Sequence, residues 1–536
     1  MKKNHTKAVK DSPWIPFRYP IFRMLWIASV VSSIGTWMQD VGAAWLMTSL
    51  TSKPLMVASI QAATSFSMFL LALPAGALAD ILDRRRYLIV SQSGLMLTAG
   101  ILALITFLGK ISPELLLLLT FCLGVGAALS FPAWLALMSE LVPSKHLPAA
   151  VTLTGVSLNL SRAVGPALAG IIIAATGPAA VFALNSLSYF GIIIALIGWE
   201  RAPSESPLPA ERFYGAMRAG LRYAWGSPAL QIVLIKSCAF FIFASGIWAL
   251  MPLVVRIQLH GGPIEFGILL ALLGSGAVLG ALLMPHLRQK LNCDQLILTG
   301  AIGFAITTFI LAIVTNFYFA CGVMVLGGIS WICVLATLTT LVQQVVSAWV
   351  RARAISIFLA IFFGGMAMGS ILWGWMATHF TISIALLIAA AGLLVFNFLT
   401  YIFISAENLI LDHTPSQHLP APIVIEPPRF EDGPVMVTVE YTVKRQNIEN
   451  FTGAMRDLRR IRLRDGAFFW SLFRDIENSK KFVECFMIES WLEHLRQHER
   501  ISISDKEIIE KVRTFHEEKT PPHILHFVAH ELPRKK

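Results

Sequence analysis

Two ionisable side chains stand inside long apolar stretches of the sequence, and they are the first candidates for chemistry. Asp40 lies in the run 22–48, and Arg162 lies midway along the run 148–175. Charged groups are costly in lipid, so they usually face a cavity or a partner. Asp40 could load and release a proton in an apolar cavity, or it could be a solvated residue near the outer end of its helix. Arg162 could be the counter-charge of Asp40 or of an anionic substrate, or a structural cation satisfied by backbone carbonyls.

Two more charged residues lie near the ends of apolar runs. Lys236 is expected to snorkel, with its aliphatic stem in lipid and its ammonium group at the interface. Glu140 closes the fourth apolar run, and we expect it to join the charged loop 80–85 rather than a central cavity.

The elements that must position these residues are membrane helices. Of the 536 residues, 56% are hydrophobic and 14% are charged, whereas soluble proteins carry about 25% charged residues. The net charge of +11 would also fit nucleic-acid binding, but the cations cluster in short loops between apolar runs, which is a signal of membrane topology. The six cysteines lack C-x-x-C spacing, and no phosphate-binding loop pattern occurs. We therefore expect no nucleic-acid partner, no metal, no cofactor and no use of ATP.

Twelve runs are long enough to cross a bilayer, for which about 20 apolar residues suffice. They span 22–48, 55–79, 87–108, 113–138, 148–175, 178–199, 229–255, 264–287, 294–315, 317–343, 352–376 and 382–405. Basic residues concentrate in alternate loops, so both termini are predicted to be cytoplasmic. The predicted fold class is an all-α membrane protein with twelve transmembrane helices in two six-helix halves, plus a C-terminal α+β ferredoxin-like domain.

Changes in composition predict the boundaries between the parts of the chain. The predicted parts are a cytoplasmic tail (1–20), a first six-helix bundle (21–199), a cytoplasmic linker with an amphipathic helix (200–228), a second six-helix bundle (229–405), a proline-rich linker (406–434) and a soluble domain (435–536).

The two halves repeat one another at a constant offset. This offset pairs Gly76 with Gly280, Arg84 with Arg288, Gly124 with Gly328, Ala150 with Ala354, Gly165 with Gly369, and Gly170 with Gly374. In an apolar chain, matches between glycines at helix contacts are less expected by chance than matches between common apolar residues. The repeat predicts two parallel six-helix units with a binding site near the midplane between them.

The loop after the second run carries a short charged motif. Its members are Gly76, Leu78, Asp80, Asp83, Arg84 and Arg85. This motif resembles the loop signature of the major facilitator superfamily, G-x-L-a-D-r-x-g-R-[KR]. It departs from that signature at Ile81, where the family usually has arginine, and at Asp83, where it usually has glycine. The resemblance implies a conformational loop in which Asp83 supplies a second acid.

The fifth run contains a second motif, built from small residues and a proline. Its members are Ser161, Gly165, Pro166, Ala169 and Gly170. The pattern is similar to the antiporter signature of drug/proton exporters, G-x3-G-P-x2-G-G, with Ser161 and Ala169 in place of glycines. That resemblance implies a helix that seals the leak path of an exporter. The alternative is an ordinary proline-kinked helix that packs closely on a neighbour.

Within the superfamily, the chain most resembles the bacterial branch of enterobactin-exporter-like proteins. The segments that carry this resemblance are Phe22-Arg23-x-Leu25-Trp26, Ser33-x-Gly35-x-Trp37-Met38 and the stretch from Ala75 to Asp80. It implies proton-driven export of a small amphipathic compound, a drug or a siderophore-like metabolite, across the inner membrane. The implied partners are the substrate, protons and the lipid bilayer.

Aromatic residues fall on helices that line the cavity in this superfamily. Among them are Trp37, Trp134 and Phe241. They would suit a bulky amphipathic or aromatic substrate, but they could equally face lipid or pack between helices.

The segment 435–536 reads as strand, helix, strand, strand, helix, strand. It is similar to the dimeric α/β-barrel domains of the antibiotic-biosynthesis monooxygenase type. The resemblance implies a homodimer through this domain. Two alternatives remain open for its role: a cofactor-free oxygenase tethered to the membrane, or a dimerisation or regulatory module without enzymatic activity.

Overall fold

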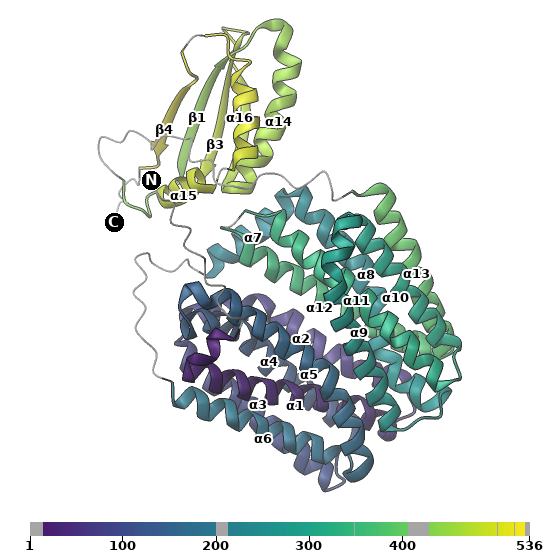
Figure 1. Ribbon diagram of the computed structural model, residues 1–536. Helices are drawn as coiled ribbons and strands as arrows, with labels where there is room; N and C mark the ends of the chain where they lie inside the picture. The colour runs from purple at the N-terminus through teal and green to yellow at the C-terminus, as the bar shows by residue number, and fades with distance from the viewer. Residues whose placement is uncertain are drawn as a thin grey trace, which may run out of the picture. The chain divides into compact units, whose positions relative to one another are not determined.

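The computed structural model describes residues 14–199, 213–347, 349–405, 428–500, 502–518 and 520–530 (Figure 1). Side chains at 73, 77, 79–81, 136, 139, 144, 213–219, 498 and 499 also lie outside the described part. The chain forms two compact units. The first, which we call the membrane unit, comprises Met1–Ala210, Ile235–Leu338 and Phe358–Ile404. The second, which we call the C-terminal unit, comprises Glu211–Leu234, Thr339–Ile357 and Ser405–Lys536.

Twelve helices of the described chain are long and apolar enough to cross a membrane. The N-terminal half contains α1 (Pro20–Leu50), α2 (Pro54–Ile81), α3 (Arg84–Phe107), α4 (Pro113–Leu141), α5 (Leu147–Thr176) and α6 (Pro178–Ile197). The C-terminal half contains α8 (Pro228–Leu253), α9 (Pro263–Lys290), α10 (Cys293–Ile313), α11 (Phe317–Gln344), α12 (Arg351–His379) and α13 (Ile382–Phe403). A π-helical turn, Val254–Gln258, extends α8. The twelve predicted spans are confirmed, each within a few residues of its predicted ends.

Local sequence explains where many of these helices begin. Proline is the first residue of α2, α4, α6 and α9, where its missing N–H costs no helical hydrogen bond. Other helices begin at a capping side chain. The Asp83 side chain accepts from the Arg86 N–H at the start of α3, and Asn292 caps α10 in the same way.

Equivalent glycines bring equivalent helices together within each half. A Cβ atom on Gly165 of α5 would stand 2.6 Å from the Cβ of Trp37 on α1. At the matching place in the C-terminal half, a Cβ on Gly369 of α12 would collide with the Ile242 carbonyl of α8. The fifth helix of each half therefore packs closely on the first helix of the same half, as the repeat predicts.

The same symmetry holds between the halves. A Cβ on Gly170 of α5 would stand 2.6 Å from the Pro263 carbonyl oxygen of α9, and a Cβ on Gly374 of α12 would stand 3.1 Å from the Leu55 Cα of α2. Each fifth helix thus crosses the second helix of the opposite half. This reciprocal packing is what a parallel repeat related by an axis along the bundle produces.

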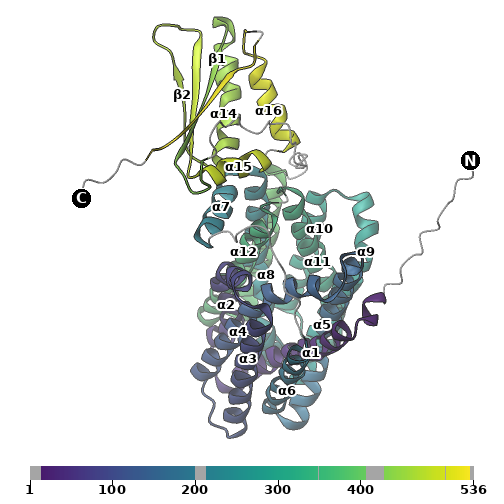
Figure 2. The ribbon, with the colours of Figure 1, turned by 90° about the vertical axis from the view of Figure 1, so that its left-hand side faces the viewer.

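The C-terminal unit contains a four-stranded antiparallel sheet in the order β2-β3-β1-β4. Its elements are α7 (Phe213–Gly226), β1 (Val435–Thr442), α14 (Ile448–Asp465), β2 (Ala467–Arg474), β3 (Lys481–Ile488), α15 (Trp491–Arg500), α16 (Ile503–Arg513) and β4 (His523–Val528). Helices α14 and α16 lie on one face of the sheet (Figures 1 and 2). The predicted α+β order is confirmed, except that two helices rather than one separate β3 from β4.

A buried carboxylate lies in the core between this sheet and its helices. Glu484 of β3 is fully buried and accepts from Arg462 Nε at 3.1 Å and from Trp470 Nε1 at 3.0 Å. The hydroxyl of Tyr441 donates to the second carboxylate oxygen at 3.4 Å. Burial and the neighbouring Glu484 charge raise the pKa of Tyr441. The cluster is a buried network in which the carboxylate oxygens have hydrogen-bond partners. Such a network costs little folding free energy while it is intact, but removing one member strongly lowers the stability of the fold.

Candidate functional site

A cavity of about 180 Å³ lies between the two halves of the membrane unit. Seven helices supply its lining, which is mainly apolar with a few polar groups, as in many small-molecule sites. The lining residues are Trp37, Asp40, Val41 and Ala44 of α1; Val57, Ile60, Gln61 and Thr64 of α2; Arg162 of α5; Trp248, Ala249 and Pro252 of α8; Phe266 and Leu270 of α9; Trp331 of α11; and Phe362 and Met366 of α12.

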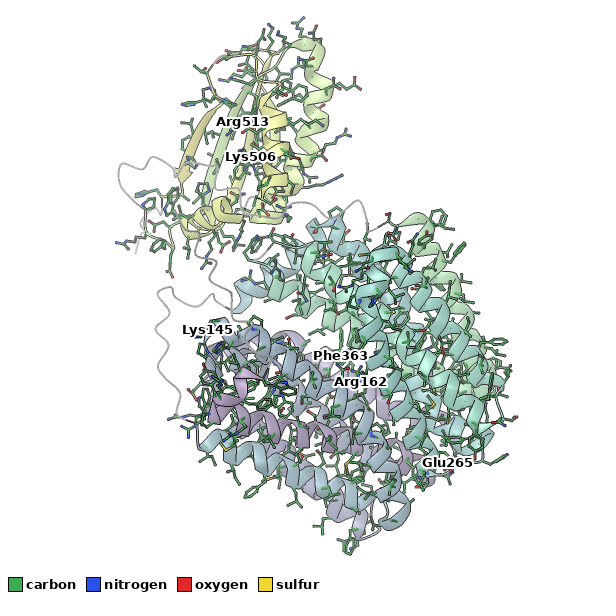
Figure 3. All side chains as sticks on the ribbon, viewed as in Figure 1. Lys145, Arg162, Glu265, Phe363, Lys506 and Arg513 are labelled. Atoms are coloured by element: carbon green, nitrogen blue, oxygen red, sulfur yellow. The ribbon has the colours of Figure 1, made fainter. Side chains whose placement is uncertain are left out.

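The cavity brings together three of the residues singled out in the sequence. Trp37 and Asp40 are neighbours on the same face of α1, and Arg162 reaches the cavity from α5. Figure 3 shows Arg162 at the boundary between the two halves, where Phe363 approaches from the opposite half. Asp40 is exposed to the cavity rather than packed against a neighbouring helix.

Arg162 rests on an aromatic ring. Its guanidinium carbon lies 5.5 Å from the ring centroid of Trp37, which is a cation–π distance. Among the described residues, no ion pair joins Arg162 to Asp40, and the buried Nε of Arg162 has no hydrogen-bond partner. In this conformation, the described residues show neither an ion pair with Asp40 nor a backbone carbonyl that accepts from the guanidinium. A contact between Arg162 and a negatively charged substrate stays a prediction.

Aromatic rings form a continuous wall from one half to the other. The ring centroids of Trp37 and Trp248 are 6.4 Å apart, those of Trp248 and Trp331 are 5.4 Å apart, and those of Trp331 and Phe362 are 6.2 Å apart. Such edge and tilted contacts stabilise aromatic clusters. The wall leaves ring faces and edges available to a flat or bulky apolar ligand.

Two of the predicted aromatic residues do not line this cavity. Phe241 is fully buried behind the wall, where its ring lies 4.5 Å from that of Phe362. Trp134 packs against a core cluster of α1, α3, α4, α5 and α6 instead. Sequence alone could not separate these from the lining residues, because an apolar run in a membrane protein has no polar face to fix its rotation. Gln61 also lines the cavity and was not predicted, although a polar residue inside an apolar run is a signal for a cavity-facing position.

Lys236 does not snorkel to the interface. Its Nζ lies 3.0 Å from Asp294 Oδ1 and donates to the Thr400 carbonyl at 3.2 Å. The side chains of Lys236 and Asp294 are 1% and 7% exposed, respectively. The prediction fails because α10 offers an acid at the right depth, and a buried cation with a partner is less costly than an unpaired one. The pair ties together α8, α10 and α13.

The charged loop between α2 and α3 makes part of the predicted network. Arg84 Nη1 lies 2.6 Å from Glu140 Oε1, which confirms the prediction for Glu140. Arg85 donates to the carbonyls of Leu196 and Ile197 at the C-terminus of α6, where a cation is favoured by the helix dipole. The Asp80 side chain lies outside the described residues.

Gly76 does not serve a close helix contact in this conformation. A Cβ atom added there would meet nothing within 4 Å among the described residues. The glycine of the loop motif therefore touches no neighbouring helix of the described chain in this conformation.

The small-residue motif of α5 does provide close packing. Ser161 Oγ donates to the Val30 carbonyl of α1 at 3.4 Å. Pro166 has no N–H to offer the Arg162 carbonyl, and Gly274 of α9 lies against that carbonyl, since its Cβ would be 2.6 Å from the oxygen. A Cβ on Gly267 of α9 would collide with the Pro166 carbonyl. We call Pro166, Gly170, Gly267 and Gly274 the α5–α9 seam.

Further contacts between the halves gather where α1 ends and α2 begins. Arg256 Nη1 donates to Thr48 Oγ1 at 3.0 Å, and the Leu55 N–H donates to Thr378 Oγ1 at 3.1 Å. The rings of Trp45 and Phe266 stack 6.0 Å apart. The two halves are therefore joined at this end of the bundle.

Known proteins similar to this chain are membrane transporters. The family model MFS_3, described as transmembrane secretion effector, matches residues 11–534. The enterobactin exporter EntS of Salmonella choleraesuis (strain SC-B67) is 24% identical over 388 residues, which cover 71% of this chain and 91% of the exporter. EntS of Citrobacter koseri is 24% identical over 387 residues, with the same coverage of both chains.

Solved structures share the fold of the membrane-spanning part. A bacterial homologue of the human lysosomal transporter Spinster, in an inward-facing and unoccupied conformation, has a TM-score of 0.58 at 13% identity and covers 74% of this chain and 98% of its own. The nucleoside transporter NupG has a TM-score of 0.55 at 13% identity, covering 72% and 100%. A D-xylose-proton symporter has a TM-score of 0.57 at 14% identity, covering 74% and 99%.

Proposed function

Because the chain belongs to the transmembrane secretion effector family of major facilitator transporters, we propose that it is a proton-coupled exporter of a small amphipathic compound. The observation that carries this proposal is the cavity between the halves, in which Asp40 and Arg162 face a wall of tryptophans. The EntS relatives are exporters of enterobactin by name. The mainly apolar lining with a few polar groups suits an amphipathic drug or siderophore-like metabolite.

Export by this route proceeds by alternating access. The ends of α1 and α8, which carry the contacts between Thr48 and Arg256, lie on the side that the charge pattern of the loops assigns to the exterior. A cavity closed on that side is in the inward-facing state, ready to receive a substrate from the cytoplasm. The chain then sits in the inner membrane with both termini in the cytoplasm.

Asp40 is the proposed proton carrier, and Arg162 is the proposed contact for negative charge on the substrate. A carboxylate in an apolar cavity exchanges its proton with whichever side the cavity faces. The Arg162 guanidinium is held over Trp37 without an acid partner among the described residues, so an anionic group can approach it without displacing a protein carboxylate.

Accumulation assays in cells with and without the gene test this function. A panel of aromatic anions, siderophores and amphipathic drugs should include compounds that accumulate less in expressing cells, and a protonophore should abolish the difference. Asp40→Asn should abolish it as well. Glu114→Gln, which changes an exposed acid at the start of α4, is the matched control and should behave as wild type. Export that persists in Asp40→Asn with full protonophore sensitivity would reject the role of Asp40.

A second proposal concerns the C-terminal domain, which we infer to form a homodimer. The sheet face opposite α14 and α16 carries exposed or partly exposed apolar side chains on all four strands, beside polar residues such as Thr438 and Glu440. Its side chains include Met436, Phe469, Phe473, Val483, Met487, Leu525 and Phe527. Phe473 is 51% exposed and Phe527 is 46% exposed. An apolar face of this kind marks an interaction site, and the resemblance to dimeric α/β-barrel domains favours a second copy of the same face.

The dimer is tested by the oligomeric state of the purified full-length protein. Phe473→Asp and Phe527→Asp should convert a dimer to a monomer in light scattering, since each places a charge on the proposed interface. Arg460→Asp introduces the same acid at an exposed position of α14 and should leave the dimer intact. A monomeric wild type would refute the proposal. A chemical conversion of substrate that disappears on deletion of 407–536 would instead favour the membrane-tethered oxygenase.

A further inference from the structure

Two arginines of the C-terminal unit rest on two aromatic rings of the same unit. The guanidinium carbon of Arg464, near the end of α14, lies 5.6 Å from the ring centroid of Tyr223 on α7. That of Arg500, at the end of α15, lies 4.3 Å from the ring centroid of Trp349, between α11 and α12. The two rings also touch each other edge to face, with centroids 5.7 Å apart. Within the C-terminal unit, the four residues join the part from β1 to β4, which we call the C-terminal domain, to α7 and to the segment between α11 and α12.

Both guanidinium groups are oriented by acids of the C-terminal domain. Arg464 lies 2.7 Å from Asp465 Oδ1 and 2.8 Å from Asp505 Oδ2. Arg500 lies 2.9 Å from Glu493 Oε2 and donates to the Asp465 carbonyl at 2.9 Å. Burial opposes ionisation of Glu493, but the positive charges of Arg500 and Arg496 outweigh it and lower its pKa. The cations are therefore held in place before they meet the aromatic rings.

One of the two rings is buried. Tyr223 is 1% exposed. The backbone of α7 comes close on two sides, since a Cβ on Gly226 would stand 3.2 Å from the Arg464 Cβ and one on Gly220 would stand 3.0 Å from the Arg353 Cβ. A buried aromatic face receiving an oriented guanidinium is a specific contact and not a random surface encounter.

We propose that Arg464, Arg500, Tyr223 and Trp349 form a clamp by which the C-terminal domain holds the segment between α11 and α12 and thereby restrains the transport cycle. The same two helices continue into the membrane unit, where Trp331 of α11 and Phe362 and Met366 of α12 line the cavity. A rigid-body change of the C-terminal half has to move these helices. A domain fastened to the segment that joins them adds to the free energy needed for that movement.

Docking is tested first, by hydrogen exchange of the full-length protein in detergent. Trp349→Leu and Tyr223→Leu remove a ring face, so exchange in α7 and α15 should become about tenfold faster, the factor expected from loss of one well-buried cation–π contact. Trp349→Phe and Tyr223→Phe keep a ring and should exchange as wild type. Unchanged exchange in the leucine variants would overturn the clamp. This readout needs no substrate, so its result is independent of whether the exporter proposal holds.

Restraint is tested second, and it rests on the proposed export function. In proteoliposomes with a substrate found in the accumulation assay, both leucine variants should export several-fold faster than wild type, while both phenylalanine variants match it. Faster hydrogen exchange with an unchanged export rate would overturn the restraint. A slower export rate in the leucine variants alone would also overturn the proposed restraint, because the contact would then be required for transport.

Discussion

The α5–α9 seam gives a sharp prediction about the conformational equilibrium. Gly267→Ala places a methyl group against the Pro166 carbonyl and within 3.1 Å of the Gly170 backbone nitrogen. These neighbours are backbone atoms of a helix, so they cannot rotate away as a side chain would. The two helices have to separate or the observed state has to lose population.

The size of the effect follows from the steric cost alone. Overpacking a well-packed contact by one methyl group costs about 1–3 kcal/mol. The higher helix propensity of alanine does not offset this cost, because a rigid-body change keeps residue 267 helical in both states. The cost lowers the population of the state with α5 and α9 in contact by about 5- to 160-fold relative to the other state.

Spin labels at two exposed positions, Thr176 at the end of α5 and His260 in the loop before α9, would report this population in a cysteine-free background. Wild type should show a dominant short distance, and Gly267→Ala should gain a longer one. Gly155→Ala is the control, because Gly155 also lies on α5 and a Cβ there meets nothing within 4 Å. Equal distance distributions in wild type and Gly267→Ala would refute the steric argument.

Three further predictions concern buried charges. Lys236→Met removes the cation from the buried ion pair with Asp294, so it should lower the apparent melting temperature in detergent and cost about 3–5 kcal/mol; a variant as stable as wild type would contradict this. Glu484→Ala removes the carboxylate that pairs with Arg462 in the core of the C-terminal domain, so it should lower the free energy of unfolding in denaturant by a similar amount. Glu484→Gln should lower it less. Burial opposes ionisation of Asp505, but Arg464 outweighs it and lowers the pKa of Asp505. Its contribution to stability is therefore complete above about pH 4 and is lost as pH falls through the lower folded pKa; Asp505→Asn should weaken this acid dependence in pH-resolved melting curves.

Much of the fold could be predicted from the sequence because lipid imposes strong constraints. Each span needs a long apolar run, and prolines or capping residues such as Asp83 mark where helices begin. The repeated glycines predicted the two halves, since Gly165 and Gly369 make equivalent contacts.

The candidate site was less predictable, because polarity could not fix the rotation of each helix. Asp40 and Arg162 stood out as charges in apolar runs, and the structure places both at the cavity. Phe241 and Trp134 are aromatic, as a cavity lining would require, but their side chains pack between helices and do not reach the cavity. Lys236 was predicted to reach the interface because its acid partner lies on a helix distant in the sequence, and one sequence gives no sign of that pairing.

The central claim is that the two halves alternate about one cavity in which Asp40 exchanges a proton for substrate. The most direct measurement is proton movement, followed with an internal pH dye, in proteoliposomes that hold only this protein and a preloaded substrate. An outward substrate gradient should drive protons inward through wild type and should drive none through Asp40→Asn. Substrate efflux from wild type without any proton entry would contradict the account.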